Sequence, residues 1–156
     1  MISVGSSLPE APSSLWEGSA NASVKFPATG KIIIVGLPGA FTPPCSSHVP
    51  GYIAHFDEFV AKGVSGIYLL AVNDIFVVNA WKESLGPKSQ VHFLSDSTAA
   101  YVKLLGMELD ATGLLGNIRS QRFVAVVQDG KVVDLRVEPD APGVTVTAAE
   151  KVLASL

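Results

Sequence analysis

The stretch 31–45, "KIIIVGLPGAFTPPC", opens on an apolar run and ends on the only cysteine of the chain. Residues 31–37 are rich in β-branched side chains and are followed by proline and glycine, a pattern typical of a buried strand. If this strand is central in a sheet, the helix that follows it must begin close to Cys45. The sequence therefore predicts a turn from strand to helix with a thiol at the start of the helix.

Two more apolar runs, 66–74 and 91–96, have the same character and predict further buried strands. The segments between the three runs have apolar residues at helical spacing instead. These residues are Tyr52, Phe56, Phe59 and Val60 in the first segment, and Phe76, Val77, Ala80 and Trp81 in the second. Strands and helices are thus expected to alternate along the chain.

The C-terminal third has a different pattern. Two apolar runs are joined by Asp129-Gly130, a strong signal for a two-residue hairpin turn. The tetrapeptide "TAAE" at 147–150 has the form of a capping box, which predicts a final helix over 149–156. Together with an irregular lead-in over the first 20 residues, this order predicts an α/β, thioredoxin-like fold with a central mixed β-sheet flanked by helices.

Composition limits the classes of protein to which the chain can belong. With 156 residues, 48% of them hydrophobic, the chain is expected to form one domain over 1–156. Eleven basic residues against 14 acidic ones, without a basic run, do not favour nucleic-acid binding. No basic segment precedes an apolar run at the N-terminus, and no window approaches the roughly 18 to 20 apolar residues that span a bilayer, so we expect an intracellular protein without a membrane span.

Cys45 is the strongest candidate for a catalytic residue. A lone cysteine excludes an internal disulfide or a thiolate zinc site, and the three histidines do not stand at metal spacing, so no metal or cofactor is predicted. A helix N-terminus favours a negative charge, and such a position can lower the pKa of a cysteine. Thr42 stands where thioredoxin-type enzymes have the first cysteine of Cys-x-x-Cys, so its hydroxyl can hydrogen-bond to the sulfur or to a substrate. On these residues alone, a reactive thiol and a small buried apolar residue remain equal alternatives.

A resemblance favours the reactive thiol. The segment "PGAFTPPC" at 38–45 is similar to the Pro-x-x-x-Thr-x-x-Cys signature of the peroxiredoxins. The later segments "VNDIFVVNAW" at 72–81 and "RFVAVVQDGKV" at 122–132 resemble the type II, or peroxiredoxin-5, branch. The likeness runs from about Gly5 to the C-terminus and is strongest to small fungal one-Cys members described as peroxisomal membrane-associated proteins.

The resemblance implies a thiol peroxidase that reduces hydrogen peroxide and alkyl hydroperoxides. Cys45 would be the peroxidatic residue that becomes a sulfenic acid, and Thr42 would hold the peroxide and the sulfur. Of Arg119 and Arg122, the second matches the family arginine that polarises the peroxide; its alternative role is a solvent-facing charge. The remaining pocket residues would be Pro38 and Pro44 beside the sulfur and Leu114 and Leu115 as an apolar collar, with ordinary core packing as the alternative for the leucines.

The chain departs from many relatives in having no resolving cysteine. Val146 stands where some animal members place it, so the expected mechanism is a one-Cys cycle in which glutathione, a glutaredoxin or thioredoxin reduces Cys45. The alternative is a redox sensor or a holdase chaperone that keeps the fold without turnover. His48 is three residues after Cys45, on the same face of a helix, where it either tunes the thiolate or is a structural or surface residue.

The resemblance also bears on assembly and location. Type II relatives pair as dimers around the active-site loops, which predicts a homodimer with Phe41 at the contact; a core position is the alternative for this side chain. The C-terminal "ASL" is a weak likeness of the peroxisomal address "SKL". We therefore expect the cytoplasm by default and the peroxisome as the alternative.

Overall fold

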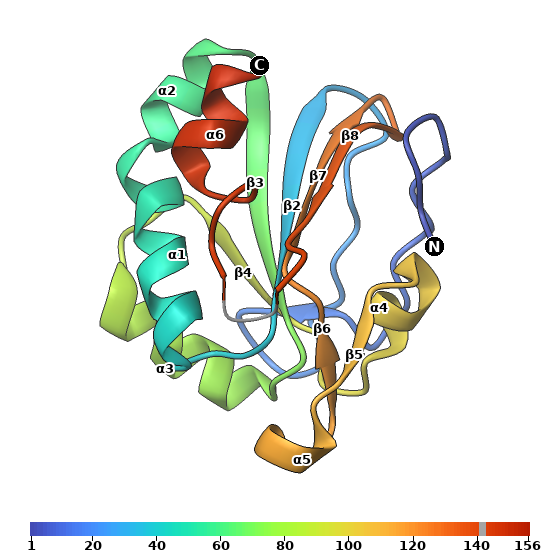
Figure 1. Cartoon of the computed structure of the whole chain (residues 1–156), viewed down its shortest axis with the longest axis vertical. Helices are drawn as coiled ribbons and strands as arrows, with labels where there is room; N and C mark the ends of the chain where they lie inside the picture. The colour runs from blue at the N-terminus through green and yellow to red at the C-terminus, as the bar shows by residue number, and fades with distance from the viewer. Residues whose placement is uncertain (141–142) are drawn as a thin grey trace.

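A six-stranded mixed sheet runs through the centre of the protein (Figure 1). The structure is a computed structural model that describes residues 1–140 and 143–156. The strand order is β1-β4-β3-β2-β7-β8. The strands are β1 (Trp16–Glu17), β2 (Lys31–Leu37), β3 (Val64–Ala71), β4 (His92–Ser95), β7 (Phe123–Gln128) and β8 (Lys131–Val137). β2, β3 and β4 are parallel, whereas β1, β7 and β8 are antiparallel to their neighbours, so the predicted mixed sheet is confirmed.

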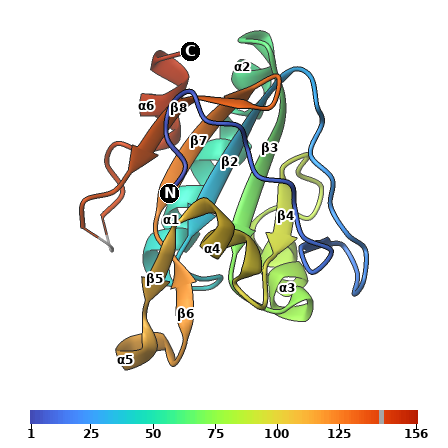
Figure 2. The same ribbon diagram turned by 90° about the vertical axis from the view of Figure 1, so that its right-hand side faces the viewer.

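Helices cover both faces of the sheet. α1 (Pro43–Ala54), α2 (Phe56–Ala61), α3 (Ile75–Leu85) and α6 (Ala149–Ala154) lie on one face, and α4 (Ala100–Leu105) lies on the other with the N-terminal segment (Figures 1 and 2). A small hairpin of β5 (Glu108–Asp110) and β6 (Ile118–Ser120) extends from one end and has α5 (Thr112–Leu115) at its tip. Across residues 1–140 and 143–156, every helix is too short or too polar to cross a membrane.

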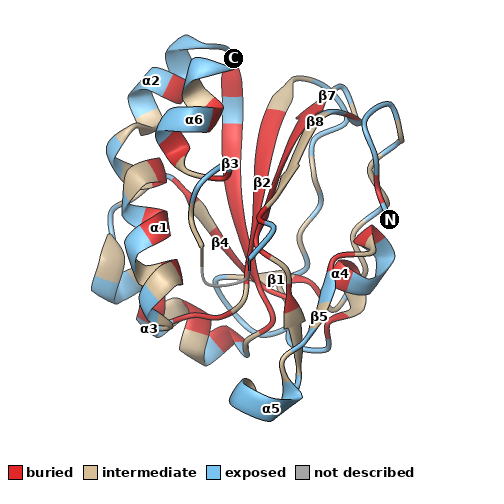
Figure 3. Ribbon diagram, viewed as in Figure 1, coloured by how far each residue is buried: buried red, intermediate tan, exposed pale blue. Residues whose placement is uncertain are grey.

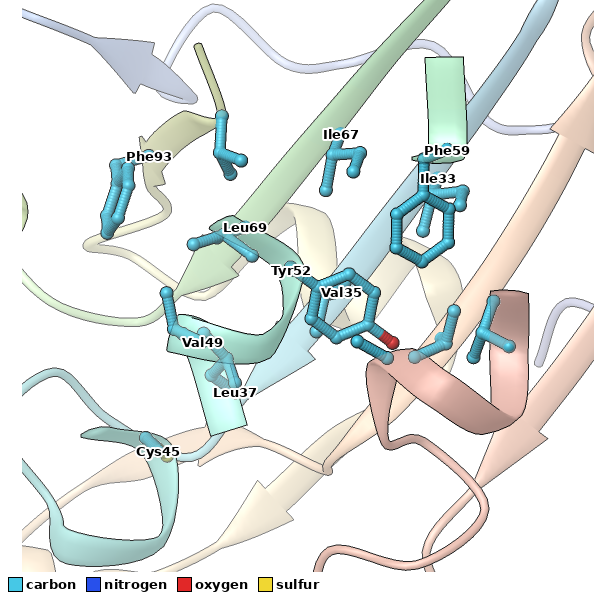
Figure 4. Packing of buried hydrophobic residues seen from close by; sticks show 14 of the residues in the cluster. Ile33, Val35, Leu37, Cys45, Val49, Tyr52, Phe59, Ile67, Leu69 and Phe93 are labelled. Carbon is cyan, nitrogen blue, oxygen red and sulfur yellow. The ribbon is translucent and has the colours of Figure 1, made fainter. Parts of the chain in front are cut away.

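The central strand is buried on both faces because its side chains alternate between two apolar clusters. Ile33 and Val35 enter the cluster under α1, α2, α3 and α6, whereas Ile32 and Ile34 enter the cluster under α4. Figure 3 shows this burial as red over most of β2 and β3. Figure 4 shows the first cluster, in which Cys45 continues the row of apolar side chains along α1.

The topology brings the end of β2 and the start of β7 to the same edge of the sheet. The two strands are antiparallel neighbours, and Gly36 pairs with Phe123. The Phe123 ring packs directly on Gly36, because a Cβ there would lie 2.0 Å from Cε1 of the ring. The residue before Phe123 is therefore placed beside the turn that follows β2.

The predicted hairpin is confirmed, and its turn explains the signal. Asp129 and Gly130 both have positive φ angles, 50° and 78°, as a type I′ turn requires. The strand expected over 66–74 is shifted toward the N-terminus, because β3 begins at Val64 and ends at Ala71. The reason is Asp74, whose carboxylate accepts a hydrogen bond from the Val77 amide and starts α3 instead.

The predicted capping box at 147–150 is wrong. Ala148 is the N-cap of α6, and the Thr147 hydroxyl donates to the Glu138 carboxylate instead of accepting from an early helix amide. A buried carboxylate thus outcompetes the helix for this side chain. Four smaller expectations also differ: residues 16–17 form β1 within the lead-in, and Val60, Phe76 and Ala80, assigned to apolar helix faces, are exposed.

Candidate active site

Cys45 lies in the first turn of α1, as the sequence predicts. The helix begins at Pro43, with Thr42 as its N-cap and prolines in its first two positions. Proline suits these positions because it lacks the N–H that a first turn leaves unpaired and its φ is already helical. The Cys45 side chain is fully buried. This burial alone fits both a reactive thiol and an apolar core residue, so its neighbours decide between them.

Arg122 is the polar neighbour of the sulfur. It directly precedes β7, and its Nη2 donates to Cys45 Sγ at 3.2 Å, while Nη1 lies 3.0 Å from His48 Nδ1. The side chain is only 2% exposed, so the alternative of a solvent-facing charge is wrong. A buried guanidinium that donates to sulfur stabilises a negative charge there, which an apolar core cysteine would not need.

Three side-chain hydrogen bonds hold the turn between β2 and α1. The Thr42 hydroxyl donates to the Gly39 carbonyl at 2.8 Å, and the Ala40 amide donates to Asn73 Oδ1 at 2.9 Å. Arg119 Nη1 donates to the Pro38 carbonyl at 3.2 Å. Asn73 and Arg119 were not identified as supports from the sequence. The position of Asn73 just beyond the end of a parallel strand is the signal that could have indicated it.

An apolar cavity of about 450 Å³ opens beside this turn. It is lined by Pro38, Thr42, Pro43, Pro44, Leu109, Ala111, Leu114, Leu115 and Arg122. The structure thus brings together all of the predicted pocket residues, although α5 supplies Leu114 and Leu115 from outside the main sheet. Leu114 is 88% exposed, so the ordinary core role does not apply to it. Because Arg122 both lines the cavity and contacts Sγ, the cavity reaches to within one side chain of the sulfur.

His48 is buried behind the guanidinium. Its Nδ1 faces Arg122, and its Nε2 lies 2.8 Å from the Thr147 carbonyl oxygen. Within the described residues no hydrogen bond joins it to Cys45, so its connection to the sulfur runs through Arg122. Burial lowers the pKa of His48 to about 4, and the Arg122 charge acts in the same direction.

The C-terminal segment supplies residues that the sequence did not indicate as part of the site. Glu138 accepts hydrogen bonds from the amides and hydroxyls of both Thr145 and Thr147. Burial alone would raise the pKa of Glu138, but these hydrogen bonds prevail and hold it at about 2. Val146 lies between the two threonines with 41% of its surface exposed. The position at which the resemblance leads us to expect a resolving cysteine in some animal members carries an apolar side chain here.

Comparisons with known proteins identify the family of the chain. The Redoxin family model matches residues 3–153. The chain is 52% identical to the peroxisomal membrane associated protein 20 of Schizosaccharomyces pombe, over all of both chains. It is 39% identical to peroxiredoxin-2C of Oryza sativa, over 99% of this chain and 98% of the relative. The chain is a peroxiredoxin.

Solved peroxiredoxin structures confirm the thioredoxin-like fold. Reduced Prx3 of Vibrio vulnificus in complex with H2O2 superposes with a TM-score of 0.88 at 38% identity, covering 99% of each chain. Peroxiredoxin 5 of Alvinella pompejana superposes with a TM-score of 0.86 at 31% identity, covering 99% of this chain and 97% of the other. With a single cysteine, this peroxiredoxin fits a one-Cys thiol peroxidase, and the comparisons favour that function over a redox sensor or a holdase.

Proposed function

We propose that Cys45 is the peroxidatic residue of this peroxiredoxin and that it reduces hydrogen peroxide and alkyl hydroperoxides. The thiolate attacks the terminal peroxide oxygen, a sulfur–oxygen bond forms and the oxygen–oxygen bond breaks. Sulfur is oxidised to the sulfenic acid, and the leaving alkoxide or hydroxide takes up a proton to become an alcohol or water. The chemistry needs one thiolate and a positive group that stabilises the charge leaving with the oxygen.

The observation that carries the proposal is the contact of Arg122 Nη2 with Cys45 Sγ at 3.2 Å. In this role the guanidinium favours the thiolate in the resting protein and donates to peroxide oxygens during attack. Arg122 Nε is buried and has no hydrogen-bond partner in the part of the chain that the structure describes. A buried donor without a partner costs about 1–3 kcal/mol, and an oxygen of a bound peroxide would supply that partner.

The other site residues have roles that follow from their chemistry. The Thr42 hydroxyl holds the peroxide, and it shapes the turn through its bond to the Gly39 carbonyl. Pro38 and Pro44 keep water from the sulfur, since both line the cavity and neither side chain can hydrogen-bond. Leu114 and Leu115 form the apolar collar that accepts the organic part of an alkyl hydroperoxide.

An external thiol completes the cycle, because the chain has one cysteine. The first thiol attacks the sulfenic sulfur, releases water and forms a mixed disulfide with Cys45. A second thiol then attacks the mixed disulfide, forms a disulfide with the first thiol and frees the Cys45 thiolate. Glutathione, a glutaredoxin and thioredoxin are the three reductants to compare.

Assembly as a homodimer is part of the proposal. Phe41 is 52% exposed on the turn beside the site, so it has the exposure that a contact residue needs and not that of a core residue. Sedimentation should give the mass of a dimer, and Phe41→Asp should shift it toward the monomer. A monomer in the unmodified protein would contradict this part.

The location follows the sequence expectation of the cytoplasm, with the peroxisome as the alternative. The name of the fission-yeast relative places that protein with peroxisomal membranes and thereby supports the alternative for this chain. Fluorescence of a protein tagged at its N-terminus, compared with a peroxisomal marker, distinguishes the two compartments.

Stopped-flow oxidation tests the proposal directly. Trp81 Nε1 donates to the hydroxyl of Ser46, the residue after Cys45, so its fluorescence reports on this turn. We expect hydrogen peroxide and tert-butyl hydroperoxide each to oxidise the reduced protein rapidly with one equivalent, and mass spectrometry to find the sulfenic acid on Cys45. Cys45→Ser should remove the change. Oxidation no faster than that of a free cysteine would overturn the proposal.

A further inference from the structure

A chain of buried polar contacts connects the reactive sulfur to the C-terminal segment. Arg122 donates to Cys45 through Nη2, and its Nη1 lies 3.0 Å from His48 Nδ1. His48 Nε2 lies 2.8 Å from the Thr147 carbonyl oxygen. The His48 side chain is 3% exposed, so water does not compete for either ring nitrogen.

These contacts determine which nitrogen of His48 carries the proton. A guanidinium has donors only, so Nδ1 must accept from Arg122 and must therefore be unprotonated. A carbonyl oxygen accepts only, so Nε2 must carry the proton that it donates to Thr147. The neutral ring with its proton on Nε2 is the one form of His48 that satisfies both contacts.

The Thr147 carbonyl is itself fixed from two sides. The Tyr52 hydroxyl donates to the same oxygen at 2.5 Å from the middle of α1. Figure 4 shows this hydroxyl directed from α1 toward the C-terminal segment. Glu138 accepts from the Thr147 amide at 2.9 Å and from the Thr147 hydroxyl at 2.6 Å. The carbonyl that orients His48 is therefore held by a carboxylate at the end of β8 and by a tyrosine in α1.

We propose that His48 is a positioning residue for the reaction at Cys45: its neutral ring, oriented by the Thr147 carbonyl, accepts from Arg122 and fixes the guanidinium against the sulfur. The inference rests on the proposed function of Cys45 and Arg122. It assigns Glu138 and Thr147, which are far in sequence from the turn between β2 and α1, to the support of the active site.

Arg122 needs such an acceptor because its side chain is long and buried. Arg122 Nε already has no hydrogen-bond partner among the described residues. Removal of His48 Nδ1 would leave Arg122 Nη1 without this acceptor as well. The side chain would then move to satisfy Nη1, and the rotational freedom of its long stem would favour alternative positions. Either movement withdraws Nη2 from the sulfur.

Two substitutions separate the acceptor from the donor of His48. In His48→Asn, the amide oxygen takes the place of Nδ1 and can still accept from Arg122. In His48→Gln, the amide nitrogen takes the place of Nε2 and can donate to Thr147, but no acceptor remains at the Nδ1 position. We expect the rate constant for oxidation of Cys45 by hydrogen peroxide to stay within about threefold in His48→Asn and to fall at least about tenfold in His48→Gln, the loss expected for one hydrogen bond. His55→Gln is the control, because this histidine lies outside the site.

Two readouts do not depend on turnover. The rate constant for alkylation of Cys45 by iodoacetamide at neutral pH should fall in His48→Gln and stay in place in His48→Asn, since a displaced guanidinium no longer donates to the attacking sulfur. Imidazole nitrogen chemical shifts in the unmodified protein should show His48 protonated on Nε2 and not on Nδ1. A proton on Nδ1, or a cationic ring at neutral pH, would overturn the inference even if both variants failed to fold.

The outcomes distinguish this inference from the proposed function. Slow oxidation of the unmodified protein would contradict the peroxidase function, while alkylation and the nitrogen shifts would still test His48. Rapid oxidation of the unmodified protein with both His48 variants unchanged, or with both impaired equally, would overturn the role of Nδ1 as acceptor. Selective loss in His48→Gln with its melting temperature maintained would support it.

Discussion

Arg122 Nη2 lies 3.2 Å from Cys45 Sγ, although 77 positions separate the two residues in the chain. The sheet creates this proximity, because Cys45 follows the end of β2 and Arg122 precedes the start of the antiparallel β7. Gly36 paired with Phe123 sets the register. The thiol follows one of these paired strands and the charge precedes the other, so the pairing of the two strands places both at the same edge of the sheet.

The guanidinium should contribute more than charge alone. Arg122→Met keeps most of the side-chain volume and removes all donors, so we expect the rate constant for oxidation to fall by about 10²–10³, as for other positioned donors to developing negative charge. Arg122→Lys keeps the positive charge but not the planar, forked arrangement of guanidinium donors. We expect its rate constant for oxidation to fall less than in Arg122→Met, though still about tenfold. Stopped-flow oxidation at neutral pH measures both. Equal rates in the lysine variant and the unmodified protein would contradict a role for the fork geometry.

The apolar collar should affect organic substrates selectively. Leu114 is 88% exposed at the cavity, so Leu114→Ser should change the free energy of unfolding by no more than about 0.5 kcal/mol. The kcat/KM for cumene hydroperoxide should fall about fivefold, since the substrate loses apolar contact, while that for hydrogen peroxide stays constant. Leu104→Ser, an exposed leucine on α4, is the matched control. A loss shared equally by both peroxides would argue against the collar.

The Thr42 hydroxyl should be required for more than the fold of the turn. Thr42→Val keeps the shape and removes the hydroxyl, and we expect oxidation to slow about 10–100-fold because both the peroxide and the Gly39 carbonyl lose a partner. Thr42→Ser keeps the hydroxyl and should stay within about threefold. Rate constants and melting temperatures of the pair separate chemistry from stability. A valine variant as fast as the serine variant would remove Thr42 from the mechanism.

The sequence predicts the local parts of this site more fully than its long-range contacts. The position of Cys45 at a helix start follows from the strand and the prolines beside it, and the hairpin follows from Asp129-Gly130, because both are local patterns. Asn73 supports the turn between β2 and α1 because β3 lies beside β2 in the sheet. The spacing of apolar residues along the sequence does not give this order of strands. Thr147 has the pattern of a helix cap, yet a carboxylate nine residues away binds its hydroxyl. Competition between a local and a distant partner is decided by tertiary packing.

Close packing at Gly36 predicts a strong effect of one methyl group. A Cβ there would lie 2.0 Å from the Phe123 ring and 2.8 Å from the Ser120 hydroxyl. Gly36→Ala should therefore lower the free energy of unfolding by about 1–3 kcal/mol, as overpacking of a buried site does. Gly113→Ala is the control, since no atom lies within 4 Å of its Cβ position. Urea unfolding of the two variants measures the difference, and equal stabilities would contradict the packing described.

The buried His48 predicts how stability depends on pH. Burial lowers its pKa to about 4, whereas an unfolded histidine has a pKa of about 6.5. Between these values the unfolded chain binds a proton that the folded protein does not, so the free energy of unfolding must fall as pH falls. The loss should reach about 2 kcal/mol at pH 5 relative to pH 7. The charged groups that act on the ring are Arg122, Glu138 and Glu150.

Glu138 and His55 also affect how the free energy of unfolding depends on pH, but in a different pH range or with the opposite sign. The pKa of Glu138 is about 2, so its carboxylate adds to the acid loss only below about pH 4.5. His55 has the opposite sign: its hydrogen bond with Glu58 raises its pKa, which favours the folded state at low pH. Urea unfolding at pH 7 and pH 5 should show the fall in the unmodified protein and in His55→Gln, but not in His48→Asn. A fall of the same size in His48→Asn would assign the effect to another group, and the neutral, buried state of His48 would then not be the cause.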